Sequence, residues 1–192
     1  MRILKNIFSQ LHRFVLWAMI LSLLWCWIYS IVGNPPRKEK VVLYVSAYAM
    51  NSRPLSLRLE DEGLPEEIKL VEPRSFDNDI FSGEMVGDIY ILKESGLRST
   101  LAEAPERLTP IELPAGMAGY EQDGKMWGIR IFDAQTQKGS AERYIQYTPY
   151  PDPEPECYYL CFDASSPHLA VLPEALDNAA WELGMTLLSI RD

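Results

Sequence analysis

Polar and aromatic side chains that could bind a ligand follow three short apolar runs of this 192-residue chain. Tyr48 and Asn51 come after the first run, Phe76 comes after the second, and Glu94 and Ser95 come after the third. If the runs are parallel strands, their carboxyl ends meet at one edge of a sheet, where open α/β sheets bind ligands. An aromatic wall with an amide, a hydroxyl and a carboxylate suits a sugar, a peptide or an amine. These five residues are therefore the candidate ligand-binding residues, and neither a cofactor nor a metal is expected.

The same five residues also suit structural roles. Tyr48 and Phe76 could pack in the core or over it, and Asn51 and Ser95 are residues that commonly cap helices or form turns. Glu94 suits the first turn of a helix, where a carboxylate interacts favourably with the helix dipole. The sequence leaves the binding and the structural interpretations open.

Catalysis is not indicated by the sequence. His12 lies beside an apolar segment, and His168, the other histidine of the chain, stands in "SSPHL", which is typical of a turn. No nucleophile elbow, phosphate loop or zinc motif is present. Cys157 and Cys161 would lie about 13 Å apart on one face of a strand, too far for a disulfide. We therefore expect two free thiols and no enzyme.

Three strands must position the candidate residues. Residues 41–47, 68–71 and 89–92 are short apolar or alternating runs, which are typical of strands. Helical stretches between them indicate βαβ units with right-handed crossovers, and hence a parallel arrangement. The third run is continuously apolar, as expected for a strand buried on both faces. Ile91→Asp should therefore destabilise the fold more than Asp88→Leu, because it buries an unpaired charge.

Start and stop signals define two helices. Ser52 could cap a helix that has Pro54 in its first turn and ends before Gly63, since glycine is common just past a helix end. Leucines at 55, 57 and 59 also alternate as in a strand, so that interpretation stays open for this segment. Residues 96–108 have leucines at helical spacing, and Pro105 should end that helix near its preceding residue.

The sequence of the second half of the domain predicts a hairpin, a loop, a strand and a helix. Asp123 and Gly124 stand between two short runs, which is a strong hairpin signal. Segment 134–156 is polar and proline-rich and predicts a long loop, whereas 157–162 predicts a strand. A last helix over 173–190 would place these residues on one face: Leu176, Ala179, Ala180, Leu183 and Leu187. The predicted fold class is α/β, with a mixed, mainly parallel sheet flanked by helices.

An apolar segment near the N-terminus predicts a membrane anchor. Residues 14–32 contain no charged side chain, and nineteen residues in a helix span about 28 Å, close to the thickness of the hydrocarbon layer. Arg2, Lys5 and Arg13 could also form the basic start of a cleavable signal, which is the rival interpretation. The anchor is favoured because the apolar stretch is long and bulky aromatic residues stand where a cleavage site needs small ones.

The anchor sets the domain organisation. We expect a basic tail over 1–13, a transmembrane helix over 14–32, a proline-containing linker over 33–40 and a soluble α/β domain over 41–192. Basic residues flank the helix almost equally on both sides, so the charge rule alone does not fix its orientation. We expect a single-pass protein of the cell membrane with its soluble domain outside the cell.

The soluble part is strongly acidic. Residues 41–192 contain 12 Lys and Arg against 26 Asp and Glu, a formal charge of −14. Such a charge repels phosphate backbones and argues against nucleic acid as a partner. The expected partners are the membrane lipid bilayer and a small solute, with a membrane protein as the alternative.

The order of several motifs resembles a known family. "FDNDIFSGEMVGDIYILKES", "LTPIELP", "YEQDGKMWGIRIF" and "YYLCFDASSPHLA" follow one another as similar motifs do in the first lobe of bacterial extracellular solute-binding proteins that feed ABC importers. The resemblance covers roughly residues 41–188 and implies an extracellular α/β lobe that binds a solute. Arg130 stands where the family's proline usually follows "GI", and segment 134–156 replaces an entire second lobe.

The missing second lobe limits what the resemblance implies. The family encloses its solute between two lobes, whereas a single lobe offers an open shelf that buries less of a ligand. We therefore expect a membrane-anchored, solute-binding-like module with weak binding or a reduced role related to transport. The alternative is a structural or protein-interaction domain that keeps the lobe's fold without a ligand and uses the vacant face for a protein partner.

Overall fold

The chain forms two compact units, Met1–Pro36 and Arg37–Asp192, in the computed structural model. The residues that the structure describes are 2–33, 35–75, 86–149, 154–173 and 175–191. The first unit is a helix and its short continuation, and the second unit contains every strand that is described.

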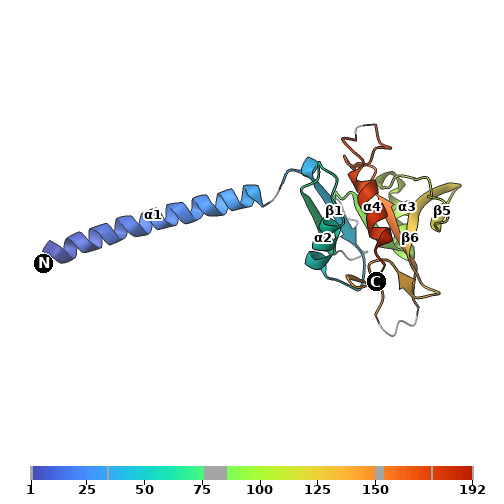
Figure 1. Ribbon diagram of the computed structural model, residues 1–192, viewed down its shortest axis with the longest axis horizontal. Helices are drawn as coiled ribbons and strands as arrows, with labels where there is room; N and C mark the ends of the chain where they lie inside the picture. Colours follow the sequence, from blue (N-terminus) through green and yellow to red (C-terminus); the bar gives the residue numbers. More distant parts are fainter. Residues whose placement is uncertain (1, 34, 76–85, 150–153, 174, 192) are drawn as a thin grey trace. The chain divides into compact units, whose positions relative to one another are not determined.

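One long helix, α1 (Arg2–Val32), makes up most of the first unit (Figure 1). Its stretch Leu11–Ser30 is long and apolar enough to cross a membrane, and none of that stretch is buried against protein. Large side chains such as Trp17 and Trp25 are exposed, which is unfavourable in water and favourable in lipid. A helix that could serve as a single-pass anchor is therefore present where the sequence predicted one.

A mixed sheet forms the centre of the second unit. In spatial order its strands are β3 (Leu70–Ser75), β1 (Lys40–Val45), β4 (Ile89–Lys93), β9 (Tyr158–Phe162), β6 (Lys125–Asp133) and β5 (Gly119–Gln122). Two further short strands lie in the segment predicted to be a loop: β7 (Lys138–Gly139) pairs with β6, and β8 (Ile145–Gln146) pairs with β2 (Ala49–Met50). An α/β fold with a mixed sheet and flanking helices is confirmed.

The first three predicted strands are parallel neighbours, as expected. β1 lies between β3 and β4 and pairs in parallel with both. The second strand is shifted from the predicted 68–71, because it begins at Leu70 and continues through Pro73 to Ser75. Proline lacks the N–H that a central strand needs, but β3 is an edge strand of the sheet and can accept it.

The second half of the sheet is antiparallel. β9 pairs antiparallel with β4 on one side and with β6 on the other. β5 and β6 form the predicted hairpin, whose turn has positive φ at both Asp123 (54°) and Gly124 (72°). A two-residue turn with both residues in this region suits aspartate and glycine, so the local signal was sufficient there.

Helices cover both faces of the sheet (Figure 1). α2 (Ser52–Asp61) and α4 (Ala179–Ser189) pack on one face, and α3 (Glu94–Glu103) packs on the other. The core layer under α2 and α4 includes Leu43, Ile89, Leu160, Leu55 and Leu183. The layer under α3 includes Tyr44, Tyr90, Leu92, Leu97 and Leu101. Successive strand residues thus point to opposite layers, as the pleat requires.

Helix α3 begins earlier than predicted. Its first residue is Glu94, so β4 passes into the helix with Lys93 as both the last strand residue and the N-cap residue. The helix ends at Glu103, just before Pro105, as predicted. The junction between β4 and α3 decides whether Lys93 or Glu94 faces the edge of the sheet.

The last helix begins later than predicted, at Ala179 rather than near residue 173. Leu176, which we expected on the buried face, is 64% exposed, whereas the other four predicted positions are buried. The N–H of Leu176 donates to the Pro167 carbonyl (2.7 Å), and the Asp177 carboxylate accepts from the Ala179 N–H (2.9 Å). These bonds keep Leu176 in a loop and start the helix after it.

Candidate functional site

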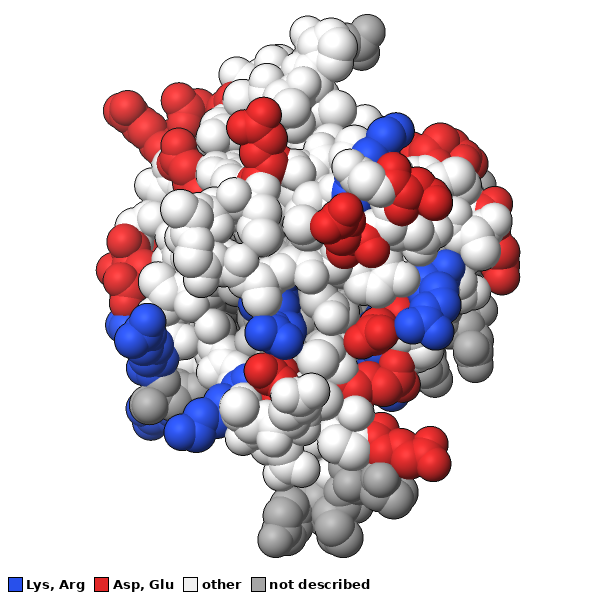
Figure 2. All heavy atoms as spheres, turned by 90° about the vertical axis from the view of Figure 1, so that its right-hand side faces the viewer, with Lys and Arg blue, Asp and Glu red and all other residues white. Residues whose placement is uncertain are grey.

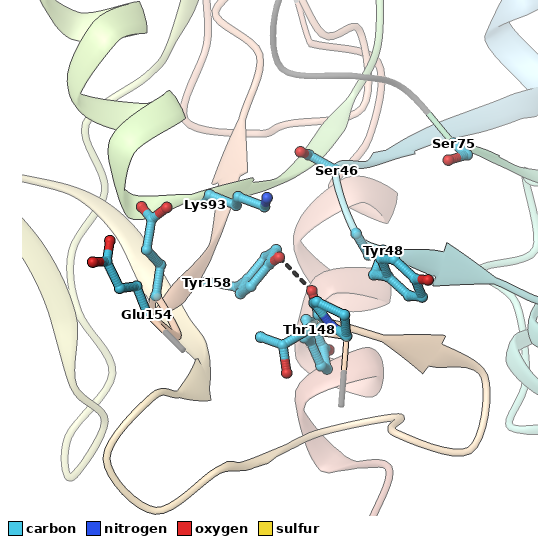
Figure 3. A pocket seen from close by; sticks show the side chains of 11 residues that line it. Ser46, Tyr48, Ser75, Lys93, Thr148, Glu154 and Tyr158 are labelled. Atoms are coloured by element: carbon cyan, nitrogen blue, oxygen red, sulfur yellow. Dashed lines mark hydrogen bonds between the residues drawn. The ribbon is translucent and has the colours of Figure 1, made fainter. Parts of the chain in front are cut away.

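A cavity of about 590 Å³ opens at the carboxyl ends of the parallel strands (Figure 3). We call it the edge cavity. Its described lining comes from the ends of β1, β3 and β4, the start of β9 and a loop: Ser46, Ala47, Tyr48, Ser75, Lys93, Tyr147, Thr148, Pro149, Glu154, Glu156 and Tyr158. Its volume lies within the range of small-molecule sites in proteins. The sequence predicted a site at this edge, and the structure places a cavity there.

Strand register brings the polar groups of this edge together. Val45 of β1 pairs with Ser75 of β3 and with Ile91 of β4, so all three strands end at a similar level. Ser46 follows directly after β1, and Lys93 stands two residues beyond Ile91 on the same face of the sheet. Both therefore lie where the apolar core ends and the cavity begins.

Lys93 is the cationic side chain among the described residues that line the edge cavity. Figure 3 shows its ammonium group directed into the cavity, between Ser46 and Tyr158. Among the residues that the structure describes, no Asp or Glu oxygen lies within ion-pair distance of Lys93. The ammonium group therefore faces the cavity without a described counter-charge.

Acidic groups lie on one side of the cavity. Glu154 and Glu156 both line it, and the Glu156 carboxylate accepts a hydrogen bond from the Ser95 N–H (2.8 Å) at the N-terminus of α3. A carboxylate at this position is stabilised by the helix dipole. The edge cavity therefore contains both signs of charge at separate positions.

Aromatic packing supports the part of the cavity wall that Tyr147 and Tyr158 form. The buried Tyr158 donates its hydroxyl hydrogen to the Tyr147 carbonyl oxygen, and the two rings lie 5.1 Å apart in an edge-to-face arrangement. Tyr147 also stacks on Phe132 of β6, with ring centroids 4.8 Å apart. These contacts attach the loop before β9 to the core, so this wall of the cavity is built on the sheet.

The five predicted binding residues lie at different places. Tyr48 lines the edge cavity and is 64% exposed. Glu94 and Ser95 line a smaller adjacent pocket of about 280 Å³, and Glu94 pairs with Arg98 across one turn of α3. Asn51 is the N-cap residue of α2 and donates its backbone N–H to the Tyr144 carbonyl. Phe76 lies outside the described residues.

The sequence interpretation missed the charged residues of the edge cavity. Lys93 stands directly before Glu94, and the strand period of two could have indicated that it shares a face with Ile91. Glu154 and Glu156 belong to the segment that was expected to replace a second lobe. Its last residues line one side of the cavity.

A second polar cluster lies at the opposite end of β4. Asp88 is fully buried and accepts two hydrogen bonds from the Arg37 guanidinium, at 2.5 and 2.8 Å. It also accepts from the Val42 N–H (2.7 Å) and the Ser166 hydroxyl (2.6 Å). With four donors around it, this carboxylate is a structural group rather than a ligand site.

His168 belongs to the same cluster and is fully buried. Its Nδ1 lies 2.9 Å from an Asp177 carboxylate oxygen, and its Nε2 lies 3.1 Å from the Arg37 carbonyl oxygen. Both ring nitrogens therefore face oxygen atoms of the protein. The imidazole does not line the edge cavity, and its contacts connect the start of the unit to the loop before α4.

Other titratable groups are also engaged in the core. Burial and the neighbouring Asp163 carboxylate raise the pKa of Tyr90, whose hydroxyl donates to Asp163 (2.7 Å) and accepts from the Gly87 N–H (3.0 Å). Burial raises the pKa of the Cys161 thiol, which makes it a poor nucleophile. Within the described part of the chain, no three His, Cys, Asp or Glu residues are grouped to hold a metal ion.

Charges of both signs are scattered over the surface that Figure 2 shows. Acidic side chains lie at many separate places, with Lys and Arg between them. Several Lys and Arg side chains lie near one another at the lower left of this view, and acidic side chains are spread over its upper part and its right side.

Comparison with known proteins identifies no relative of this chain. No family model, no curated protein and no solved structure matches the chain. The functional argument therefore depends on the edge cavity and the side chains that line it.

Proposed function

We propose that the chain is a membrane-anchored binding module that holds a small polar solute in the edge cavity. The observation that supports this best is the cavity itself, which lies at the carboxyl ends of β1, β3 and β4 and is lined by hydroxyl, ammonium and carboxylate groups. Ligands of open α/β sheets commonly bind at this position. The proposal is binding without catalysis, and no cofactor is part of it.

The order of motifs that resembles the first lobe of extracellular solute-binding proteins is in keeping with this proposal. In such a reduced module α1 is the anchor, and the segment before β9 contributes a cavity wall in place of a second lobe. The described residues form no second lobe over the cavity, so in this proposal the ligand keeps part of its solvent contact. We expect dissociation constants of roughly micromolar to millimolar, because fewer contacts offset the cost of immobilising the ligand.

The proposed location is the outer face of a bacterial cell membrane, with α1 crossing the bilayer once. Protease treatment of intact cells, followed by detection of the domain, tests this sidedness. Digestion of the domain in intact cells is expected, whereas protection until the cells are opened would contradict the proposed orientation.

The binding proposal is tested by thermal unfolding of the full chain in detergent micelles. Amino acids, short peptides, sugars and polyamines are each added at millimolar concentration, because a ligand of the native state raises the unfolding temperature. Tyr48→Ala should weaken the shift without lowering the stability of the free protein, since Tyr48 is mostly exposed. Leu57→Ala is the matched control, because Leu57 is 53% exposed on α2 and does not line the cavity. The absence of a shift with every solute class would refute the proposal.

A second candidate function is that of a protein-interaction domain. A groove of about 690 Å³ lies between the β5–β6 hairpin and the chain before α4, and it includes Ile111, Met126, Val171 and Trp181. Val171 is 66% exposed, and exposed apolar surface of this kind can mark a protein contact. Cross-linking in membranes from a cysteine placed at Val171 tests this function. A specific cross-linked partner together with no solute binding would favour it over the first proposal.

A further inference from the structure

The positive and negative side chains that line the edge cavity indicate which class of solute it can bind. The sequence suggested a carboxylate, Glu94, as the charged group that a ligand would meet at the end of the third strand. The structure places Lys93 in the cavity instead, and Glu94 lies outside its lining. A ligand at the end of β4 therefore meets a positive group rather than a negative one.

Lys93 differs from many other cationic side chains of the second unit. Lys40 pairs with Glu72 (3.1 Å), and Lys69 pairs with Glu39 (2.8 Å). In a domain with a formal charge of −14 over residues 41–192, carboxylates are abundant, yet none of the described ones lies within 4.0 Å of the Lys93 ammonium. A half-buried lysine whose ammonium group faces a cavity in this way is suited to an anionic group of a ligand.

Hydroxyl groups are also part of the cavity lining. Ser46, Ser75 and Thr148 line the cavity, and Figure 3 shows Ser46 close to the direction in which Lys93 points. Hydroxyl donors combined with an ammonium group are the usual partners of a carboxylate. A polyamine would instead bring like charge to Lys93, which disfavours binding.

The acidic side of the cavity argues against a ligand that carries only negative charge. Glu154 and Glu156 line the same cavity as Lys93, so the formal charges of these three side chains sum to −1. A simple anion would meet repulsion from both glutamates, whereas a solute with separate negative and positive groups would meet complementary charges. Figure 3 shows Glu154 on the opposite side of the lysine from the space into which the ammonium points.

We propose that the edge cavity binds a small zwitterionic solute of the amino-acid or short-peptide class, with its carboxylate on Lys93 and its ammonium group toward Glu154 and Glu156. This inference rests on the proposed function as a binding module and specifies its ligand. Tyr48, at the far wall and mostly exposed, supplies an aromatic face for the rest of the solute.

The test uses the full chain in detergent micelles and isothermal titration with four probes of similar size. Alanylalanine carries both charges, its C-terminal amide carries only the positive charge, its N-acetyl derivative carries only the negative charge, and glucose is neutral. We expect alanylalanine to bind at least about tenfold more tightly than the other three, since losing one buried charge contact costs roughly a factor of ten or more.

Variants of Lys93 separate the inferred role from a general effect on the fold. Lys93→Met should reduce the affinity for alanylalanine at least about tenfold, and Lys93→Arg should restore most of it, because a guanidinium keeps the positive charge. Lys138→Met is the matched control, since Lys138 is exposed on β7 and does not line the cavity. Thermal unfolding of each free variant checks that its domain is folded, and Lys93→Gln replaces Lys93→Met if the latter is not.

The outcomes distinguish this inference from the function on which it depends. Binding of glucose or the amide as tightly as alanylalanine, or unchanged alanylalanine affinity in a folded Lys93 variant, would overturn the zwitterion inference and leave the binding module standing. No heat and no thermal shift with any of the probes and solute classes would overturn both.

Discussion

Replacing Asp88 by leucine should be among the most damaging single substitutions in the domain. The sequence presented Asp88 as a polar residue that opens a buried strand, where an apolar replacement looked mild. In the structure its carboxylate is fully buried and accepts from Arg37, from the Val42 N–H and from the Ser166 hydroxyl. Leucine is larger than aspartate and leaves no cavity, so the expected loss comes from the unpaired polar groups and from the extra volume in a closed site.

The magnitude follows from those donors. Val42 and Ser166 are buried, and each donor left without an acceptor costs about 1–3 kcal/mol. The side chain of Arg37 is 33% exposed, so water can compensate part of the loss of its ion pair. Breaking a buried pair by removing one partner costs about 3–5 kcal/mol in general, and we expect Asp88→Leu to lower the free energy of unfolding by about this amount. This cost is comparable to that expected for Ile91→Asp.

Urea unfolding of the full chain in detergent micelles, followed by pulse proteolysis, measures this loss. Pulse proteolysis reports the unfolded fraction of the domain without interference from the helical signal of α1. Asp61→Leu is the matched control, because Asp61 is exposed at the end of α2, and it should change the free energy of unfolding by no more than about 0.5 kcal/mol.

A double-variant cycle tests the pairing itself. Arg37→Met alone leaves a buried carboxylate without its cation, so it should also be strongly destabilising. The double variant, Arg37→Met with Asp88→Leu, removes both charges, so neither is left buried without a partner. Its free energy of unfolding should therefore be about 1–3 kcal/mol higher than the sum of the two single losses predicts. Additive losses, or an Asp88→Leu variant as stable as the Asp61 control, would refute the structural role of this ion pair.

Two further predictions concern titration and thiol reactivity. Burial alone would raise the pKa of Glu72, but hydrogen bonds and charges from Arg74 and Lys40 outweigh it, and the net pKa lies below the ordinary value of 4.5. A carboxylate whose pKa is lower in the folded state stabilises the fold at every pH above its pKa in the unfolded state. We therefore expect Glu72→Gln to destabilise the domain slightly at pH 7 and to make no difference once the pH falls below the pKa of Glu72 in the folded state. Urea midpoints measured at each pH check this. Burial raises the pKa of the Cys161 thiol, so little of it is present as the reactive thiolate. A maleimide at pH 8 should therefore modify the half-buried Cys157 in the native protein, and Cys161 only after unfolding. Peptide mass spectrometry measures both rates, and equal rates in the native protein would contradict this.

Local signals were sufficient where a feature depends on a few neighbouring residues. Asp123 and Gly124 accept positive φ and form the hairpin turn that their types predict. Pro105 cannot continue a helix, and α3 ends two residues before it. The apolar run 89–92 is a buried strand, because its side chains are needed in both core layers. The position of the edge cavity, at the carboxyl ends of the parallel strands, follows from the same strand assignments.

The identity of the residues that line the edge cavity required the tertiary structure. Glu94 and Lys93 are adjacent in sequence, and a shift of one residue at the junction of β4 and α3 exchanges the side chain that faces the cavity. Glu154 reaches the cavity because β9 inserts between β4 and β6, and that pairing has no local signal.

The burial of Asp88 was also decided by distant parts of the chain. Its partners Arg37 and Ser166 lie 51 and 78 residues away in sequence. Hydropathy and spacing describe only near neighbours, so they place an aspartate at a strand end on the surface. The sequence by itself determined the longer strands, the approximate helices and the hairpin turn, because these depend on backbone preferences and local alternation, but it did not indicate the short strands β7 and β8. Only the tertiary structure decided which charges are buried and which face the cavity, because the environment of a charge is set by segments that meet after folding.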